Sequence, residues 1–183
     1  MSSVVISGDT SGAVTVAAPA VAGTTTITMP AVTGTMSVLP TTPSMVRLNT
    51  ANGYGSTNTV IRRFTTAVTN QGSDITYADS ATLGATFTIN TTGIYAVSYV
   101  ECLTSAQTIG ISLNSNQLTT AVYGITQSAI LMVAQAGASN PGAGASWTGL
   151  LTAGDVIRAH TIGTASATNG GFASTFFTIV RVA

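Results

Sequence analysis

The scarcity of charged side chains constrains this sequence more than any other feature. Only 5% of its 183 residues are charged, as five arginines, four aspartates and one glutamate, and the net charge is zero. A soluble domain of average composition carries about 25% charged residues. With a mean hydropathy of +0.46, a lone chain of 18.3 kDa would expose much apolar surface to water. We therefore expect this surface to be buried between copies of the chain, in a homotrimer.

The low charge also argues against several kinds of partner. Binding to nucleic acid through phosphate contacts needs many cations, and the five arginines are scattered along the chain. A membrane-spanning helix needs about 20 apolar residues, whereas the longest apolar run here is Ala129–Ala134. The residues after Met1 lack the cationic start and apolar segment of a signal peptide. We expect no nucleic-acid partner, no membrane and no leader peptide.

The inventory for catalysis is small. Acid–base chemistry and metal binding rely mainly on histidine, aspartate, glutamate and cysteine, and the chain holds one histidine, five acidic residues and one cysteine. A lone cysteine cannot form an internal disulfide. A glycosidase would need a pair of carboxylates at a defined separation. We therefore expect no enzyme, and assign no catalytic residue, no cofactor-binding residue and no metal ligand.

Three residues could nevertheless carry chemistry. His160 lies on an expected strand without a neighbouring carboxylate other than Asp155, so a structural role is favoured over that of a base or ligand. Cys102 ends an apolar strand, where a lone cysteine usually behaves as a small buried hydrophobe rather than a nucleophile. Asp155 follows a glycine, and such a residue more often hydrogen-bonds its own turn than a metal.

Four further features could likewise serve either chemistry or structure. Arg62 and Arg63 would point to opposite faces of a strand, so we expect one to pair with a carboxylate across a chain interface and the other to be solvated. Trp147 could stack on a sugar, but a buried or interface aromatic is favoured. The segment Gly142-Ala-Gly144 lacks the lysine and helix of a phosphate-binding loop.

The residue pattern predicts an all-β chain. Threonine is the commonest residue, at 34 of 183, and β-branched side chains favour strands. Alternating apolar residues mark strands in residues 44–183, which we expect to form an antiparallel jelly-roll sandwich. The expected strands are Thr86–Ile89, Ile94–Cys102, Thr108–Leu113, Ile125–Gln135, Trp147–Leu151, Val156–Ile162 and Phe172–Val182, with a loop at Gly137–Ala145.

Residues 1–43 differ from the rest and contain a repeat. The segment 15–24 aligns with the segment 26–35, and each copy reads as a strand, a proline and a glycine turn. Such units need neighbouring copies to form a core, so we expect an extended β arm that serves attachment and trimerisation. Val16, Val21, Ile27 and Val32 would face partner chains. Pro40-Thr-Thr-Pro43 would act as a stiff hinge.

Residues 44–183 resemble the globular heads of the tumour-necrosis-factor/complement superfamily. The resemblance rests on four motifs in order. They are Phe87-Thr-Ile-Asn-Thr-Thr-Gly93-Ile-Tyr95, Ile111-Ser-Leu-Asn114-Ser-Asn116, Leu151-Thr-Ala-Gly154-Asp155-Val-Ile157 and Phe172-Ala-Ser-Thr-Phe176-Phe177. The resemblance implies a ten-strand jelly roll that forms tight trimers.

The N-terminal segment resembles one found near the start of tailed-phage structural proteins. It reads Ser7-Gly-Asp-Thr-Ser-Gly12, then Ala18-Pro19, then the segment 23–30, which ends at Pro30. The resemblance implies a virion accessory protein, made in the host cytoplasm and placed on the outer capsid surface or the tail. A chain of 183 residues favours a capsid decoration (cement) protein that binds the major capsid protein or another virion protein through its arm. The alternative is a receptor-binding tail-fibre or tail-tip protein whose loops, such as Gly137–Ala145, bind a host glycan or protein.

Overall fold

The computed structural model describes residues 3–7, 13–17, 42–54, 59–137, 142–162, 168–169, 172–173 and 175–183. The chain divides into two units, Met1–Val38 and Leu39–Ala183. In the first unit β1 (Ser3–Ser7) pairs antiparallel with β2 (Ala13–Ala17). Val16 lies on β2 and is 53% exposed. The positions 21, 27 and 32, most of the repeat and part of the proline hinge fall outside the described residues.

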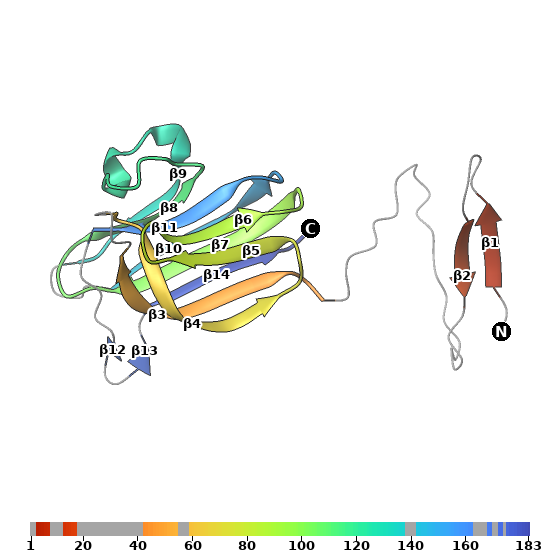
Figure 1. Cartoon of the computed structure of the whole chain (residues 1–183), viewed down its shortest axis with the longest axis horizontal. Coiled ribbons are helices and arrows are strands. Elements are labelled where there is room, and N and C mark those ends of the chain that lie inside the picture. The colour runs from red at the N-terminus through yellow and green to blue at the C-terminus, as the bar shows by residue number, and fades with distance from the viewer. Residues whose placement is uncertain are drawn as a thin grey trace. The chain divides into compact units, whose positions relative to one another are not determined.

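The second unit is a sandwich of two five-stranded antiparallel sheets (Figure 1). The first sheet has the order β10-β7-β14-β3-β4 and the second the order β5-β6-β11-β8-β9. The strands of the first sheet are β3 (Met45–Tyr54), β4 (Arg62–Gln71), β7 (Gly93–Cys102), β10 (Gly142–Leu151) and β14 (Phe176–Arg181). Those of the second are β5 (Ile75–Ser80), β6 (Gly84–Ile89), β8 (Thr108–Leu113), β9 (Ile130–Gln135) and β11 (Val156–Thr161). The expected all-β sandwich is thus confirmed.

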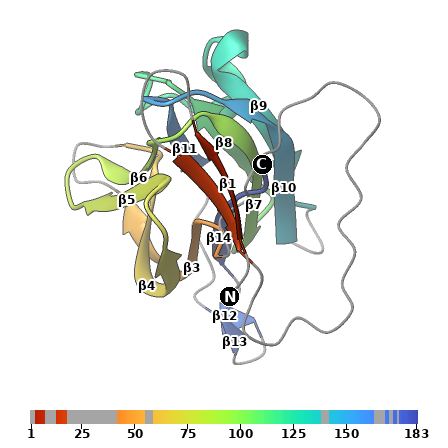
Figure 2. The ribbon, with the colours of Figure 1, turned by 90° about the vertical axis from the view of Figure 1, so that its right-hand side faces the viewer.

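The two sheets meet along both edges of the sandwich. Figure 2 shows β4 beside β5 on one side and β9 beside β10 on the other, in agreement with the contacts between these strands. A short pair, β12 (Thr168–Asn169) and β13 (Phe172–Ala173), and two 3-10 turns, η1 (Val122–Gly124) and η2 (Gln127–Ala129), complete the described elements.

The core between the sheets follows the alternation of the sequence. Tyr95, Val97 and Tyr99 on β7 are buried together, as the pattern predicts. At the centre Phe87 of β6 stacks on Phe177 of β14, with ring centroids 4.2 Å apart. Aromatic rings bury large apolar areas, so this pair joins the two sheets.

Three expected boundaries are wrong. The strand predicted over Ile125–Gln135 begins only at Ile130, because η1 and η2 precede it. The loop predicted over Gly137–Ala145 is strand from Gly142 onward, since Ala143 and Ala145 point into the core and pair with β7. The strand predicted over Phe172–Val182 is two pieces, β13 and β14.

Candidate functional site

The described part of the chain contains no cluster of three or more histidine, cysteine, aspartate or glutamate side chains that could hold a metal ion. It also has no helix with the length and apolar character needed to cross a membrane.

His160 is buried in β11 and has the surroundings of a structural residue. Neither ring nitrogen makes a hydrogen bond of good geometry, although the Thr120 backbone lies close enough to favour the charged ring slightly. Burial, helped by the positive charge of Arg158, lowers the pKa of His160 to about 4. A fully buried imidazole without a polar partner is poorly placed to exchange protons with a substrate.

A buried ionic cluster lies between β4 and β7. Arg62 and Glu101 are 1% and 0% exposed, and the two side chains form an ion pair. Tyr99 donates its hydroxyl hydrogen bond to the same carboxylate, and Arg62 Nη1 donates to the Gly53 carbonyl oxygen at 3.3 Å. Burial raises the pKa of Glu101 and outweighs the opposing effect of Arg62. Because buried charges need such partners, the cluster has a structural role.

The ion-pair partners of the adjacent residues Arg62 and Arg63 differ from the expectation. The two arginines do point to opposite faces, but each pairs with a carboxylate of its own chain. Arg63 lies near the surface and its Nη2 is 2.7 Å from Asp79 Oδ2. The expected ion pair across a chain interface is not needed, because Glu101 of β7 and Asp79 of β5 already pair with the two arginines within the chain. The Arg63–Asp79 pair links β4 of the first sheet to β5 of the second.

Asp155 acts as a turn residue, as expected. Its Oδ2 accepts a hydrogen bond from the Thr152 backbone N–H at 2.8 Å, and its Oδ1 accepts one from Asn114 Nδ2 at 2.7 Å. Partial burial opposes the charged carboxylate, but the bonds from Thr152 and Asn114 prevail and lower the pKa of Asp155. The side chain fastens the β10–β11 turn to the end of β8.

The remaining candidates also have structural surroundings. Cys102 is half-buried on the outer face of β7, not fully buried as expected. Trp147 packs against the core, and its ring occupies the space where a Cβ at residue 149 would lie. This placement agrees with a buried aromatic rather than a sugar platform. Gly142 and Gly144 lie in the regular strand β10, so they form no phosphate loop.

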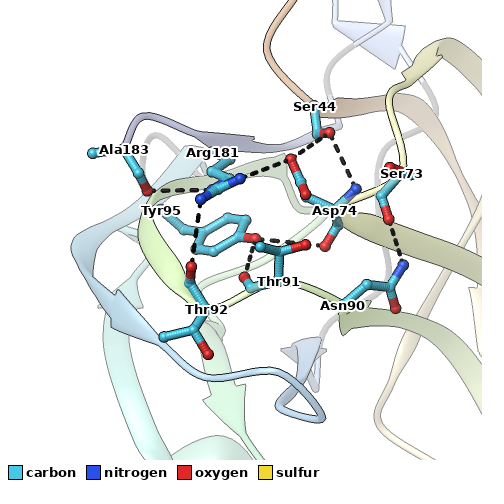
Figure 3. A network of polar contacts seen from close by, with 9 residues as sticks. All are labelled: Ser44, Ser73, Asp74, Asn90, Thr91, Thr92, Tyr95, Arg181 and Ala183. Atoms are coloured by element: carbon cyan, nitrogen blue, oxygen red, sulfur yellow. Dashed lines mark hydrogen bonds and ion pairs between the residues drawn. The ribbon is translucent and has the colours of Figure 1, made fainter. Parts of the chain in front are cut away.

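The sequence analysis missed a polar network at the C-terminus (Figure 3). Asp74 follows β4, and its Oδ2 accepts hydrogen bonds from Ser44 Oγ at 2.8 Å and from Arg181 Nη1 at 3.3 Å. Bonds from Thr91 and Ser44 lower the pKa of Asp74. Arg181 Nε donates to the Ala183 carbonyl oxygen at 3.3 Å. The network ties the last strand to the β4–β5 turn.

The Gly93-Ile-Tyr95 motif belongs to the same region. A Cβ on Gly93 would collide with the Ala183 carbonyl oxygen, while that oxygen accepts a 2.7 Å hydrogen bond from the Ile94 N–H. The Tyr95 hydroxyl donates to the Thr91 carbonyl oxygen at 2.6 Å. The glycine therefore makes room for the end of the chain, and the tyrosine closes the preceding turn. This motif is the one sequence signal that could have located the network.

The outer face of the first sheet carries little charge. On β10, β7, β14 and β3 the described side chains that point away from the core are small, apolar or uncharged polar, except for Arg47. We call this set the β7 face. It consists of Met45, Arg47, Asn49, Ile94, Ala96, Ser98, Val100, Cys102, Gly144, Ser146, Thr148, Leu150, Phe176, Thr178 and Val180.

Apolar side chains lie towards one end of the β7 face, whereas the row across its middle is polar and consists of Ser146, Ser98, Thr178 and Arg47. Val100 lies directly between Gly144 of β10 and Phe176 of β14. The Arg47 guanidinium lies 5.8 Å from the centroid of the Phe176 ring, a cation–π distance. Val100 and Leu150 are 46% and 62% exposed. These two side chains lie towards opposite ends of the face. Exposed apolar side chains on a sheet face with little charge can mark an interaction site in a soluble protein.

A scan against protein-family models found no match, and neither did a search of curated proteins. Solved structures of murine APRIL, a jelly-roll domain of the tumour-necrosis-factor family, are similar to this chain. The structure at pH 8.5 has a TM-score of 0.51 at 14% identity and covers 77% of this chain and 100% of that one. The structures at pH 8.0 and pH 5.0 have the same coverage, with TM-scores of 0.48 at 14% and 15% identity. At this identity the likeness shows the fold alone, and it confirms a jelly-roll sandwich of the tumour-necrosis-factor type.

Proposed function

We propose that this chain is a non-enzymatic structural protein of a tailed-phage particle. It forms a homotrimer through the β7 face and decorates the capsid, where the N-terminal segment binds the major capsid protein or another virion protein. Three subunits held together in this way would bridge neighbouring shell proteins and stabilise them mechanically.

The observation that carries the proposal is the low charge of the β7 face. A free monomer normally keeps extended sheet faces polar, whereas this face offers Val100, Leu150 and Phe176 with a single cation. A stable interface buries about 800 Å² on each partner. Apolar burial contributes about 25 cal/mol per Å², so cohesion can arise here without ion pairs. A second copy of the same chain fits this face, because that copy also carries few charges and no net charge.

The first unit supports a role in attachment. Val5, Ile6 and Val16 are all more than half exposed on the isolated pair β1–β2. A two-stranded pair is marginally stable alone in water. Partner chains would cover these side chains and pair with the strand edges.

The number of copies per particle tests the proposal. Quantitative mass spectrometry of purified particles is expected to find hundreds of copies of this chain per particle. Particles stripped of this protein should keep their tails. A handful of copies located at the tail would contradict decoration and would instead favour a receptor-binding tail-fibre or tail-tip protein.

Attachment is tested separately with a chain that lacks residues 1–43. Full-length protein should rebind particles from which it has been stripped, whereas the truncated chain should not. Circular dichroism and light scattering on the truncated chain check that the sandwich still folds and assembles. Rebinding of the truncated chain at full occupancy would show that the sandwich carries the attachment site.

A further inference from the structure

A groove of about 490 Å³ opens on the second sheet beside the 3-10 turn η1. Its volume lies within the roughly 300–1,000 Å³ of small-molecule sites. In Figure 1 the segment with η1 and η2 stands beside β9. Residues that line the groove include Gln107, Thr108, Tyr123, Val133, Gln135 and Ile162.

The floor of the groove follows from strand alternation. Ile109 and Ile111 point into the core, so Thr108 and Gly110 face outward. The register sets Gln135 opposite Thr108, so both side chains lie on this outer side.

Backbone hydrogen bonds fix the floor on both sides. The Ala136 N–H donates to the Gln107 carbonyl oxygen at 2.8 Å, and the Ile162 N–H donates to the Thr108 carbonyl oxygen at 3.4 Å. The floor therefore belongs to the rigid sheet.

Tyr123 forms the rim and is held in place by its neighbours. Val122 is fully buried over Gly110, where a Cβ would lie 2.5 Å from Val122 Cγ2. Ile125 on the other side is also buried. The Tyr123 side chain itself is 66% exposed. An aromatic ring fixed on an anchored backbone loses little conformational freedom when a ligand packs on it.

The polar groups of the groove are uncharged and available. Within the part of the chain that the structure describes, no charged side chain lines it. Neither the side-chain amides of Gln107 and Gln135 nor the Tyr123 hydroxyl has a hydrogen-bond partner there. Each amide offers two donors and an acceptor, which suits hydroxyl groups that both donate and accept. An ionised ligand would lose hydration without gaining a counter-charge.

We propose that this groove binds an uncharged saccharide. The C–H face of a sugar ring packs on Tyr123, and its hydroxyl groups pair with Gln107 and Gln135. Single exposed aromatics are common on protein surfaces, but Tyr123 stands at a groove that also offers two glutamine amides and, within the described residues, no charge. It goes beyond the proposed function and holds for a capsid or a tail location.

The test uses the full-length protein and saturation-transfer difference NMR. The probes are maltohexaose, cellohexaose, mannohexaose and chitohexaose, with tri-galacturonate as a charged comparator, each up to 10 mM, roughly the upper limit of weak binding. We expect at least one uncharged probe to receive saturation and tri-galacturonate to receive none. No transfer to any uncharged probe, or equal transfer to the charged one, would overturn the proposal.

Variants connect binding to the groove. Tyr123→Ala should weaken binding of the responding probe about tenfold, since truncation of an aromatic anchor costs on the order of one decade or more. Tyr123→Phe should change it by less than about threefold, because the ring is kept. Gln135→Ala should weaken it several-fold. Leu83→Ala, at an exposed apolar residue in the β5–β6 turn that does not line the groove, serves as the control. Binding that is unchanged in Tyr123→Ala would place the saccharide elsewhere and refute the site.

Discussion

The single histidine gives a direct measure of how tightly the sandwich is packed. Burial lowers the pKa of His160 from 6.5 to about 4 in the folded protein. The unfolded chain therefore takes up a proton on this ring at a higher pH than the folded chain does. The stability that comes from the neutral ring is fully present above pH 6.5 and is lost as the pH falls towards 4.

The size of the effect follows from the shift in pKa. Each unit is worth about 1.4 kcal/mol, so the whole shift corresponds to about 3 kcal/mol. Between pH 7 and pH 5 the free energy of unfolding should fall by about 2 kcal/mol from this residue alone. Glu101 works in the opposite direction, because its raised pKa lets the folded protein take up a proton as the pH falls.

The assay is guanidinium unfolding at fixed protein concentration, at pH 7 and at pH 5, on the native chain and on His160→Gln. The fall in unfolding free energy between pH 7 and pH 5 is measured for the native chain and for His160→Gln. Subtracting the second fall from the first removes the contribution of Glu101, and the remainder should be about 2 kcal/mol. Since the chain has one histidine, the imidazole NMR signal gives its folded pKa without assignment. A folded pKa near 6.5, or no difference between the chains, would refute the burial argument.

Two further predictions concern the ion pairs and the end of the chain. Glu101→Ala should lower the free energy of unfolding by about 3–5 kcal/mol, because it leaves Arg62 buried without a counter-charge. Asp79→Ala, which breaks the surface pair with Arg63, should lower it by only about 0–1 kcal/mol. Equal losses in chemical denaturation would contradict the burial of the Arg62–Glu101 pair. Gly93→Ala should cost about 1–3 kcal/mol by overpacking against the carbonyl oxygen of Ala183. A melting temperature equal to that of the native chain would show that this carbonyl does not pack against Gly93 as described.

Regular alternation made much of the sandwich predictable. From Tyr95 to Tyr99 on β7 every second residue is large and mainly apolar, so the strand and its buried face were identified from local sequence, and β8 was found with its bounds. The start of β10 was missed because glycine and alanine resemble loop composition, although alanine suffices where two sheets approach closely. The turns η1 and η2 were missed, although the polar residues Thr126, Gln127 and Ser128 separate Ile125 from the apolar residues of β9.

The polar clusters could not be predicted in the same way. Arg62 and Glu101 are 39 residues apart, and Asp74 and Arg181 are 107 residues apart. Their pairing depends on the registers between strands, which the spacing of single residues does not reveal. Likewise, the sequence around Gly110 does not indicate that Val122 packs over this glycine. Sequence reasoning found most strands after residue 84 but gave no bounds for β3, β4 or β5. The contacts between distant strands came from the structure.

The mass of the assembly in solution tests the central claim most directly. Light scattering on the full chain at micromolar concentration should give about three times 18.3 kDa. Val100→Asp should reduce this mass to that of a single chain, since it would bury an unpaired carboxylate within the β7 face. Leu83→Asp, at a residue with the same 46% exposure in the β5–β6 turn, should leave it unchanged. A monomeric native chain, or a Val100→Asp variant that keeps the trimeric mass, would contradict assembly through the β7 face.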